Sequence, residues 1–428
     1  MSLLRTISAD ELDRAVKPVV SDEVLLQAKT IVERVWREGE PAIRAYAEHF
    51  GERTPDQPLV LGQAEMRVAF ESLDKADRAA LVRAGERIER FAKAQLGAIS
   101  PIIVDVPGGQ AGHTIEPVGA AGCYAPAGRY PLPSSVLMTG ITARAAGCER
   151  VVVASPGANP AALAAAHIAG ADEFLCVGGA HAIAAMGYGF EGFAGCDVIA
   201  GPGNAWVTAA KQLVSGVVGI DMLAGPSELL IIADDSADVA TLAADLLAQA
   251  EHDTDAVPML VTTNPLHPDE IQLELARQLE TLPTAETARV ALGNGFIIVC
   301  DSINQAIDLA DRIAPEHLEV ITRDAESVAQ QVRNAGGVFI GPRTAEVLGD
   351  YGIGPNHTLP TGGTARFQAG LSVTHFLRLR TWIRIDDPTG NEAVLDDTMR
   401  IARMEGLIGH ERSAAARSSS RSANRSPN

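Results

Sequence analysis

The chain has 428 residues, 46% of them hydrophobic and 4% aromatic, and carries a formal net charge of −19 at pH 7. This acidic balance argues against a nucleic-acid partner, because affinity for phosphate backbones comes from Lys and Arg. No run reaches the roughly 18 apolar residues of a membrane span, and the N-terminal sequence MSLLRTISADELD lacks the apolar core of a signal peptide. We therefore expect a cytoplasmic protein without a membrane partner.

The N-terminal third predicts helices. Ser21 is a candidate N-cap for the first of two helices within residues 21–50, and Pro41 opens the second after Gly39. A longer helix with alternating charges is predicted over residues 75–95. These helices are expected to be scaffold.

From about residue 119 the pattern changes to short apolar runs that alternate with helices. One series spans residues 149–214 and a second spans residues 227–341. Such alternation is typical of parallel sheets covered by helices, so the predicted fold class is α/β. Two sheets are expected rather than one, because so many strands rarely share one open, twisted sheet. After about residue 371 the alternation stops.

Glycine-rich turns mark two strand ends in the first series. Gly178–Gly179 and the sequence GPGN at 201–204 each lie where a predicted strand gives way to a helix. Such turns let a backbone approach a phosphate or ribose closely, and they are equally typical of plain tight βα turns. A literal G-x-G-x-x-G at 187–192 follows a helix rather than a strand, so we reject it as a dinucleotide fingerprint.

Gln249 and His252 are a candidate pair of metal ligands. They stand three residues apart near the end of a predicted helix, so they project from one face. This spacing suits two ligands of one ion, while a histidine at a helix end is also a common surface group that offsets the helix dipole. The pair needs further ligands before it indicates a metal site.

Two polar loops carry the other candidate groups. Glu316 and His317 follow Pro315, between a predicted helix and strand, and an adjacent acid and imidazole suit general acid–base chemistry. A solvated turn is the alternative. Asp350 and His357 belong to a glycine-rich segment, GDYGIGPNH, that follows a strand.

Together these segments resemble the histidinol dehydrogenase family over nearly the whole chain. The resemblance rests on ordered blocks: YAPAG with PSSVLM (124–138), VGGAHAIAAM (177–186), GPGNAWV (201–207), GIDMLAGPSE (219–228), DLLAQAEHD (245–253), APEHLE (314–319), GDYGIGPNHTLPT (349–361) and EGLIGH (405–410). It implies two incomplete Rossmann-like domains with parallel-rich sheets, and N- and C-terminal arms exchanged within an intertwined homodimer.

Domain boundaries follow from that expectation. Residues 21–123 and 233–370 would form the first Rossmann-like domain, with the metal and catalytic residues, and residues 124–232 the second, on the NAD side. Residues 1–20 would be an N-terminal arm and residues 371–412 the C-terminal dimer-exchange arm. The Ser/Arg-rich tail at 413–428 is expected to be disordered, because it cannot bury enough apolar surface to fold.

The resemblance also implies a zinc ion and a reaction. Gln249, His252 and Asp350 of one subunit and His410 of the other would hold the zinc, and a mixed O/N ligand set is reasonable for this metal. His317 would be the general base and Glu316 would activate water. A primary alcohol would then be oxidised through an aldehyde to a carboxylate by two NAD, with L-histidinol as the substrate, in histidine biosynthesis.

Cofactor and substrate contacts are implied as well. NAD contacts are assigned to Tyr124, His181 and Asn204. Substrate contacts are assigned to the zinc ligands, to His317 and to four further residues: Ser227, Glu346, His357 and Glu405.

Several departures from the family pattern leave the substrate open. His181 replaces the usual Gln, which puts one cofactor contact in doubt, and Ala92 stands where a His is common. His113 and Arg129 resemble a divergent branch that includes sulfopropanediol dehydrogenases, so 2,3-dihydroxypropanesulfonate is an alternative substrate for the same chemistry. An inactive metal- or nucleotide-binding homologue is the alternative of another class, and it would have no need of the whole catalytic and ligand set.

Overall fold

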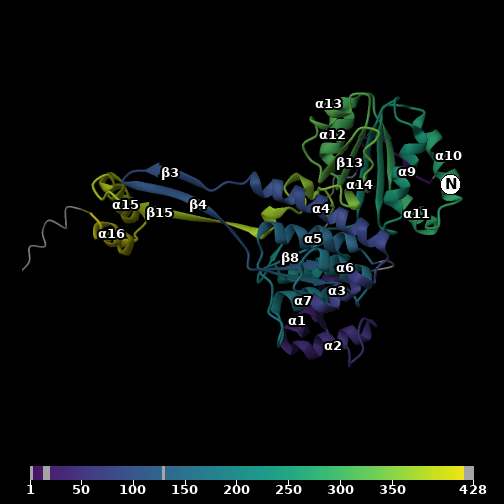
Figure 1. Ribbon diagram of the computed structural model, residues 1–428. Helices are drawn as coiled ribbons and strands as arrows, with labels where there is room; N and C mark the ends of the chain where they lie inside the picture. The colour runs from purple at the N-terminus through teal and green to yellow at the C-terminus, as the bar shows by residue number, and fades with distance from the viewer. Residues whose placement is uncertain (1–2, 13–19, 128–130, 419–428) are drawn as a thin grey trace, which may run out of the picture. The chain divides into compact units, whose positions relative to one another are not determined.

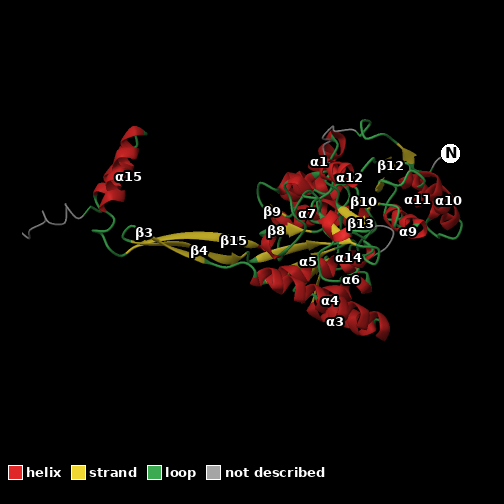
Figure 2. Ribbon diagram, turned by 90° about the horizontal axis from the view of Figure 1, so that it is seen from above, coloured by secondary structure: helices red, strands yellow, loops and turns green. Residues whose placement is uncertain are grey.

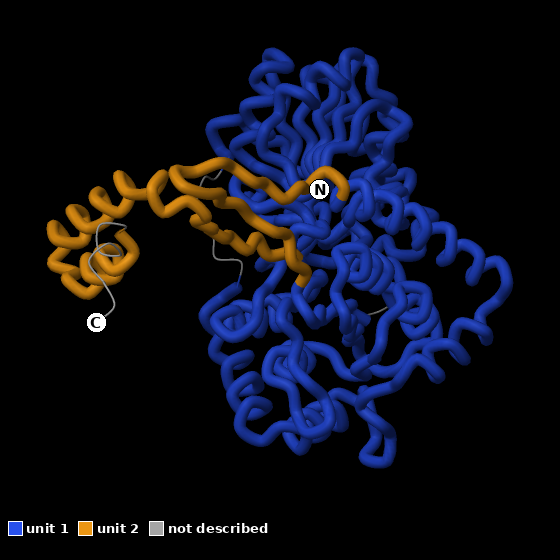
Figure 3. Tube along the Cα trace, turned by 60° about the vertical axis from the view of Figure 1, so that its left-hand side comes forward, with its two compact units in different colours: residues 1–96, 118–376 blue, residues 97–117, 377–428 orange. Residues whose placement is uncertain are grey.

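The computed structural model describes residues 3–12, 20–127 and 131–418, and the chain forms two compact units. The larger unit comprises residues 1–96 and 118–376, and the smaller comprises residues 97–117 and 377–428 (Figure 3). The larger unit contains two six-stranded, parallel-rich sheets. The predicted α/β fold class and the prediction of two sheets are therefore confirmed.

The first sheet of the larger unit is entirely parallel. Its strands, in spatial order, are β1 (Arg5–Thr6), β12 (Phe296–Val299), β11 (Val257–Thr262), β10 (Glu228–Ala233), β13 (His317–Ile321) and β14 (Gly337–Ile340). The helices that follow in sequence are α9 (Val239–Ala250), α10 (His267–Leu279), α11 (Ala285–Leu292), α12 (Ile303–Ile313), α13 (Ala325–Ala329) and α14 (Val347–Asp350).

Helices cover both faces of this sheet, which explains the continuous apolar runs of its strands. Leu229 and Ile231 pack with α9, α10 and α11, whereas Leu230 and Ile232 pack with α12 and α13 (Figure 1). Leu4 is fully buried in the first of these layers, next to β1. The described residues before β1 therefore belong to this domain core, and the prediction that residues 1–20 form an arm is wrong for them.

The second sheet has one antiparallel edge strand, β2, and is otherwise parallel. Its strands, in spatial order, are β2 (Val60–Gly62), β7 (Glu173–Leu175), β6 (Arg150–Ala154), β5 (Ala120–Tyr124), β8 (Val198–Ala200) and β9 (Gly219–Ile220). Its helices are α1 (Asp22–Glu38), α2 (Glu40–His49), α3 (Gln63–Ser72), α5 (Pro133–Ala146), α6 (Pro160–Ile168), α7 (Gly179–Tyr188) and α8 (Ala205–Val214).

The N-terminal helices belong to this second sheet. Val32 and Val35 of α1 share a buried cluster with Ile183 of α7 and Val207 of α8, and β2 pairs with β7. The prediction that residues 21–123 complete the first Rossmann-like domain is therefore wrong for α1, α2 and β2, because their apolar faces are buried against the NAD-side helices and strands. The long predicted helix is confirmed as α4 (Lys75–Gly97).

The smaller unit is an antiparallel ribbon followed by two helices. The ribbon consists of β3 (Ile102–Val106), β4 (Gly109–Pro117) and β15 (Leu377–Ile385), which run side by side (Figures 1 and 2). The helices are α15 (Glu392–Met404) and α16 (Ile408–Ala415). The β3–β4 hairpin was not predicted. None of the helices in the described residues has the length and apolar character that crossing a membrane requires.

Two predicted C-terminal boundaries need correction. Leu371 and Phe376 are buried in the larger unit, so the smaller unit takes up the chain from residue 377 rather than 371. The predicted disorder from residue 413 is wrong for the end of α16, which continues to Ala415 and buries Ala414. The remainder of the predicted tail, from residue 419, lies outside the described residues.

Candidate active site

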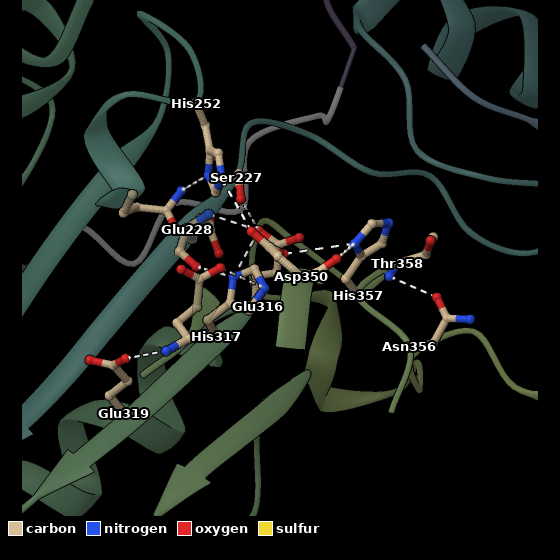
Figure 4. A network of polar contacts seen from close by, with 12 residues as sticks. Ser227, Glu228, His252, Glu316, His317, Glu319, Asp350, Asn356, His357 and Thr358 are labelled. Atoms are coloured by element: carbon tan, nitrogen blue, oxygen red, sulfur yellow. Dashed lines mark hydrogen bonds and ion pairs between the residues drawn. The ribbon is translucent and has the colours of Figure 1, made fainter. Parts of the chain in front are cut away.

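The candidate catalytic residues gather at the amino-terminal end of the first sheet. Glu316 and His317 lie at the start of β13, beside Ser227 and Glu228 at the start of neighbouring β10. The carboxyl end of α9 supplies Gln249 to the same edge, which His252 joins just beyond the helix. Figure 4 shows the side chains of His252, His317 and Asp350 close to one another, with Glu319 lying apart.

The tautomer of His317 follows from its backbone contact. Its Nδ1 lies 3.0 Å from the carbonyl oxygen of Glu228, and a carbonyl can only accept, so Nδ1 carries the proton. The unprotonated Nε2 then faces the carboxylate of Glu346, with Oε1 3.6 Å away. His317 is 3% exposed. The arrangement leaves Nε2 free to accept a proton and places a carboxylate where it would stabilise the resulting imidazolium.

Glu316 is held by the start of β10. Its Oε2 accepts hydrogen bonds from Ser227 Oγ at 2.7 Å and from the Glu228 backbone N–H at 2.8 Å. Burial, which outweighs these hydrogen bonds, raises the pKa of Glu316 to about 8. A buried carboxyl group that titrates near neutral pH can exchange a proton with water or substrate.

A cluster of carboxylates and imidazole lies beside the catalytic couple. His252, Glu346 and Asp350 offer ligand atoms that all lie within 4.8 Å of one another. His252 Nε2 is 3.3 Å from Asp350 Oδ2, and Gln249 Nε2 is 3.4 Å from His252 Nδ1. Glu346 and Asp350 are four residues apart across α14, so they share one side of this short helix.

The buried atoms of this cluster fit a divalent cation. Gln249 Oε1 and both carboxylate oxygens of Glu346 are buried, and within the described part of the chain none of them has a hydrogen-bond partner. Burial raises the pKa of Glu346, whereas at His252 the hydrogen bond to Asp350 and the nearby carboxylates outweigh burial and raise the pKa to about 9. Concentrated negative charge with orphaned oxygens is the environment that a metal ion satisfies.

The predicted ligands Gln249, His252 and Asp350 are therefore brought together. Glu346, which the sequence analysis assigned to substrate, lies within the same group and could also reach an ion.

His357 connects the Asp350 loop to α5 beside the second sheet. Its Nδ1 donates to the Asp350 backbone carbonyl at 3.0 Å, and its Nε2 lies 3.1 Å from Ser135 Oγ on α5. Burial lowers the pKa of His357, so the neutral form is favoured. Ser135 was not singled out from the sequence, although it lies in the PSSVLM block.

Glu228 is a second residue that the sequence analysis missed. Its backbone N–H binds Glu316 and its backbone carbonyl binds His317, so one residue fixes both members of the catalytic couple. Its carboxylate accepts from the Gly362 backbone N–H at 3.1 Å, and burial raises its pKa to about 7. The available sequence signal was its place at the end of the GIDMLAGPSE block, next to Ser227.

The predicted cofactor residues lie at the carboxyl ends of strands in the second sheet. Tyr124 ends β5, and its hydroxyl oxygen accepts from the Gly179 backbone N–H at 3.0 Å. Asn204 caps α8 with its side-chain oxygen and is exposed. Gly179 and Gly201 both have positive φ, at 60° and 129°. Both turns therefore favour glycine, and turns of this kind let a backbone approach a phosphate or ribose closely.

His181 is occupied differently from Tyr124 and Asn204. Its Nε2 lies 2.9 Å from Glu52 Oε2, the residue is 1% exposed, and its ring stacks against Phe50. Glu52 also accepts from the Gly178 backbone N–H at 3.1 Å, at the start of α7. The substitution of the usual Gln by His181 is thus accompanied by a carboxylate partner that the sequence alone did not reveal.

Three of the singled-out residues lie outside the larger unit, and a fourth is not described. Glu405 and His410 are exposed on the helical part of the smaller unit, and His113 on β4 contacts the Ser100 carbonyl with its Nε2 at 3.3 Å. Arg129 lies outside the described residues.

Comparisons with known proteins agree on one family. A family model described as histidinol dehydrogenase matches residues 16–418. The chain is 39% identical over 392 residues to a histidinol dehydrogenase from Methanosarcina mazei, with 90% of each chain covered. It is 43% identical over 385 residues to one from Thermus thermophilus, with 90% of this chain and 92% of the relative covered.

A solved structure extends this likeness to the fold. The crystal structure of histidinol dehydrogenase from Elizabethkingia anophelis matches with a TM-score of 0.90 and 32% identity, and covers 97% of this chain and 98% of that one. The sequence blocks, the two sheets and the full-length relatives lead to one conclusion: the chain belongs to the histidinol dehydrogenase family.

Proposed function

We propose that the chain is a zinc-dependent, NAD-linked dehydrogenase that oxidises L-histidinol through the aldehyde to L-histidine, in histidine biosynthesis. The observation that carries the proposal is the convergence of the Glu316–His317 couple with His252, Glu346 and Asp350 in one partly buried cluster. A cytoplasmic homodimer with a shared site is part of the proposal.

The zinc is proposed to be held by Gln249, His252 and Asp350, with His410 of the partner subunit as the fourth ligand. Zinc in such a site would orient and polarise the alcohol group of the substrate. Ser227, Glu346, His357 and Glu405 are proposed to hold the rest of the substrate. Glu405 is suited to the substrate ammonium group, because opposite charges attract.

His317 is proposed to act as the base in the oxidation steps. Its Nε2 takes the proton of the substrate hydroxyl while the carbon gives up its hydride, which NAD accepts when bound. The imidazolium is stabilised by Glu346, which faces Nε2 at 3.6 Å. Because Nδ1 is already committed to the Glu228 carbonyl, the ring keeps the correct tautomer for this role.

Glu316 is proposed to act between the two oxidations. It takes a proton from a water molecule as the water oxygen adds to the aldehyde carbon, and the resulting hydrate loses a second hydride to give the carboxylate. Its raised pKa, about 8, suits this exchange near neutral pH. The hydrogen bonds to Oε2 keep the carboxyl group in place, so the other oxygen is left for the water.

A substrate panel tests this function directly. Purified zinc-loaded protein is assayed for NADH formation with L-histidinol and with 2,3-dihydroxypropanesulfonate. We expect two NADH per L-histidinol consumed and little turnover of the sulfonate. A strong preference for the sulfonate would change the proposed substrate but not the proposed reaction. No NADH with either alcohol would favour an inactive binding homologue.

Metal removal supplies the second test. Dialysis against a chelator is expected to abolish NADH formation, and added zinc is expected to restore it, because the carboxylate cluster is left uncompensated without a cation. Full activity of protein shown to be free of metal would rule out the zinc site.

A further inference from the structure

A buried ion pair outside the catalytic cluster holds the cofactor-side turn at residues 201–204. Lys211 of α8 and Asp221, just after β9, form an ion pair and are 2% and 9% exposed. Lys211 Nζ donates to the Gly201 carbonyl at 3.0 Å, and the Gly201 N–H donates to Asp221 Oδ2 at 2.8 Å. Lys211 and Asp221 therefore bind the carbonyl group and the N–H group of the same residue, Gly201.

Folding stability alone does not explain why Lys211 and Asp221 form a buried ion pair. Removing two charges from water carries a large desolvation cost, and a well-packed apolar pair is often at least as stabilising. Gly201, in contrast, needs to be held: its φ is 129°, and a Cβ there would lie 2.0 Å from the Tyr124 carbonyl oxygen. Lys211 and Asp221 thus bind the backbone of the 201–204 turn, which lies close to Tyr124, a predicted NAD contact.

The segment that begins at Asp221 continues to the catalytic couple. Thr208 Oγ1 of α8 donates to the Ala224 carbonyl at 2.7 Å, and the Gly225 N–H donates to Thr361 Oγ1 at 2.5 Å. The segment ends at Ser227, whose hydroxyl binds Glu316. The segment 221–227 therefore contacts the 201–204 turn through Asp221 at its start and Glu316 through Ser227 at its end.

We infer that Lys211 and Asp221 are positioning residues that fix the 201–204 turn in the shape that receives NAD. The inference rests on the proposed function for the identity of the ligand. Its structural part, the fixing of the turn, rests on the contacts to Gly201 alone. The two parts are measured separately.

The test uses the full chain with Lys211→Met, and with Lys211→Met and Asp221→Asn together, so that in the double variant no buried charge is left unpaired. The control removes an exposed ion pair on α4, with Glu89→Gln and Lys93→Met. Hydrogen exchange of the amides at 201–206 and calorimetric NAD affinity are measured for each. Bound zinc is measured as well.

Both Lys211 variants are expected to exchange the 201–206 amides about tenfold faster and to bind NAD about tenfold more weakly, a change of about 1.4 kcal/mol. Their zinc content, and the whole behaviour of the control, should match the parent. Unchanged exchange in the double variant, or unchanged NAD affinity despite faster exchange, would overturn the inference. A parent chain that binds no NAD would overturn the proposed function, whereas faster exchange in its Lys211 variants would still support the fixing of the turn.

Discussion

The two sheets of the larger unit use opposite ends. In the first sheet the candidate catalytic groups lie at the amino ends of β10 and β13, and they are titratable side chains. In the second sheet the candidate cofactor groups lie at the carboxyl ends of β5, β7 and β8, and they are mainly glycine backbones. Open α/β sheets usually bind ligands beyond their carboxyl ends, so the second sheet follows the general rule and the first does not.

The connection between the sheets explains the difference. β9 of the second sheet ends at Ile220 and β10 of the first begins at Glu228, so the chain passes directly from the carboxyl edge of one sheet to the amino edge of the other. Residues 221–227 alone connect the two edges. Under the proposed function, one edge would supply backbone for a cofactor and the other would supply proton-transferring groups.

The largest expected effect is on the catalytic edge. His317→Ala is expected to lower kcat by about 10³-fold, because a positioned general base contributes about 10²–10⁴-fold. Glu316→Gln is expected to yield one NADH per alcohol rather than two, because water addition to the aldehyde loses its base. Steady-state rates and single-turnover NADH yields measure both, with His167→Ala on α6 as control. Turnover of His317→Ala at the parent rate would remove the proposed base.

On the cofactor edge the corresponding test alters the backbone conformation of a glycine rather than a titratable side chain. Gly201→Ala is expected to lower the free energy of unfolding by about 2–4 kcal/mol, because it adds a strained positive φ to a clash with the Tyr124 carbonyl. Gly216→Ala is the matched control, since nothing lies within 4 Å of its added Cβ. Denaturant unfolding compares the two. Equal stability of both variants would show that the 201–204 turn relaxes freely.

The elements of both sheets could be predicted from periodicity, but their partners could not. The apolar face of α1 indicates that the helix is buried, yet the same face would pack equally well against either sheet, and Val32 lies against the second one. The β3–β4 hairpin escaped prediction because its Gly108 turn joins strands without a buried apolar face, with Ile103 and Val104 exposed.

The candidate site shows the same limit at the level of single residues. Gln249 and His252 were predicted as a pair because they stand three positions apart, and that spacing is visible in the sequence. Glu228 acts through backbone groups, which every residue possesses, so nothing in its letter distinguishes it. The partnership of Glu52 with His181 joins positions 129 residues apart and depends on tertiary packing.

The smallest expected effect concerns a buried acid pair beneath the catalytic edge. Glu319 on β13 is fully buried and accepts the Glu346 backbone N–H at 2.6 Å, while its Oε2 has no hydrogen-bond partner among the described residues. A proton held on Glu319 would remove its buried charge and could be donated to the Asp245 carboxylate of α9. Burial first, and the facing carboxyl of Asp245 second, raise the pKa of Glu319 well above its ordinary value.

The raised pKa determines how stability depends on pH. The folded state holds a proton that the unfolded chain releases above about pH 4.3, so the stabilisation is complete below that pH and is lost as pH rises through the raised pKa. Glu319→Gln keeps the acceptor for Glu346 and supplies a permanent donor to Asp245. It should therefore match the parent near pH 5 and exceed it by about 1–2 kcal/mol near pH 8.5.

Unfolding free energies of the parent and Glu319→Gln, measured across that pH range with Glu326→Gln on the exposed side of α13 as control, would show whether the two curves diverge. Parallel curves would mean that the Asp245–Glu319 pair shares no proton. Divergence would show that the catalytic edge, unlike the glycine-built cofactor edge, carries a stability cost that grows with pH because its groups are titratable.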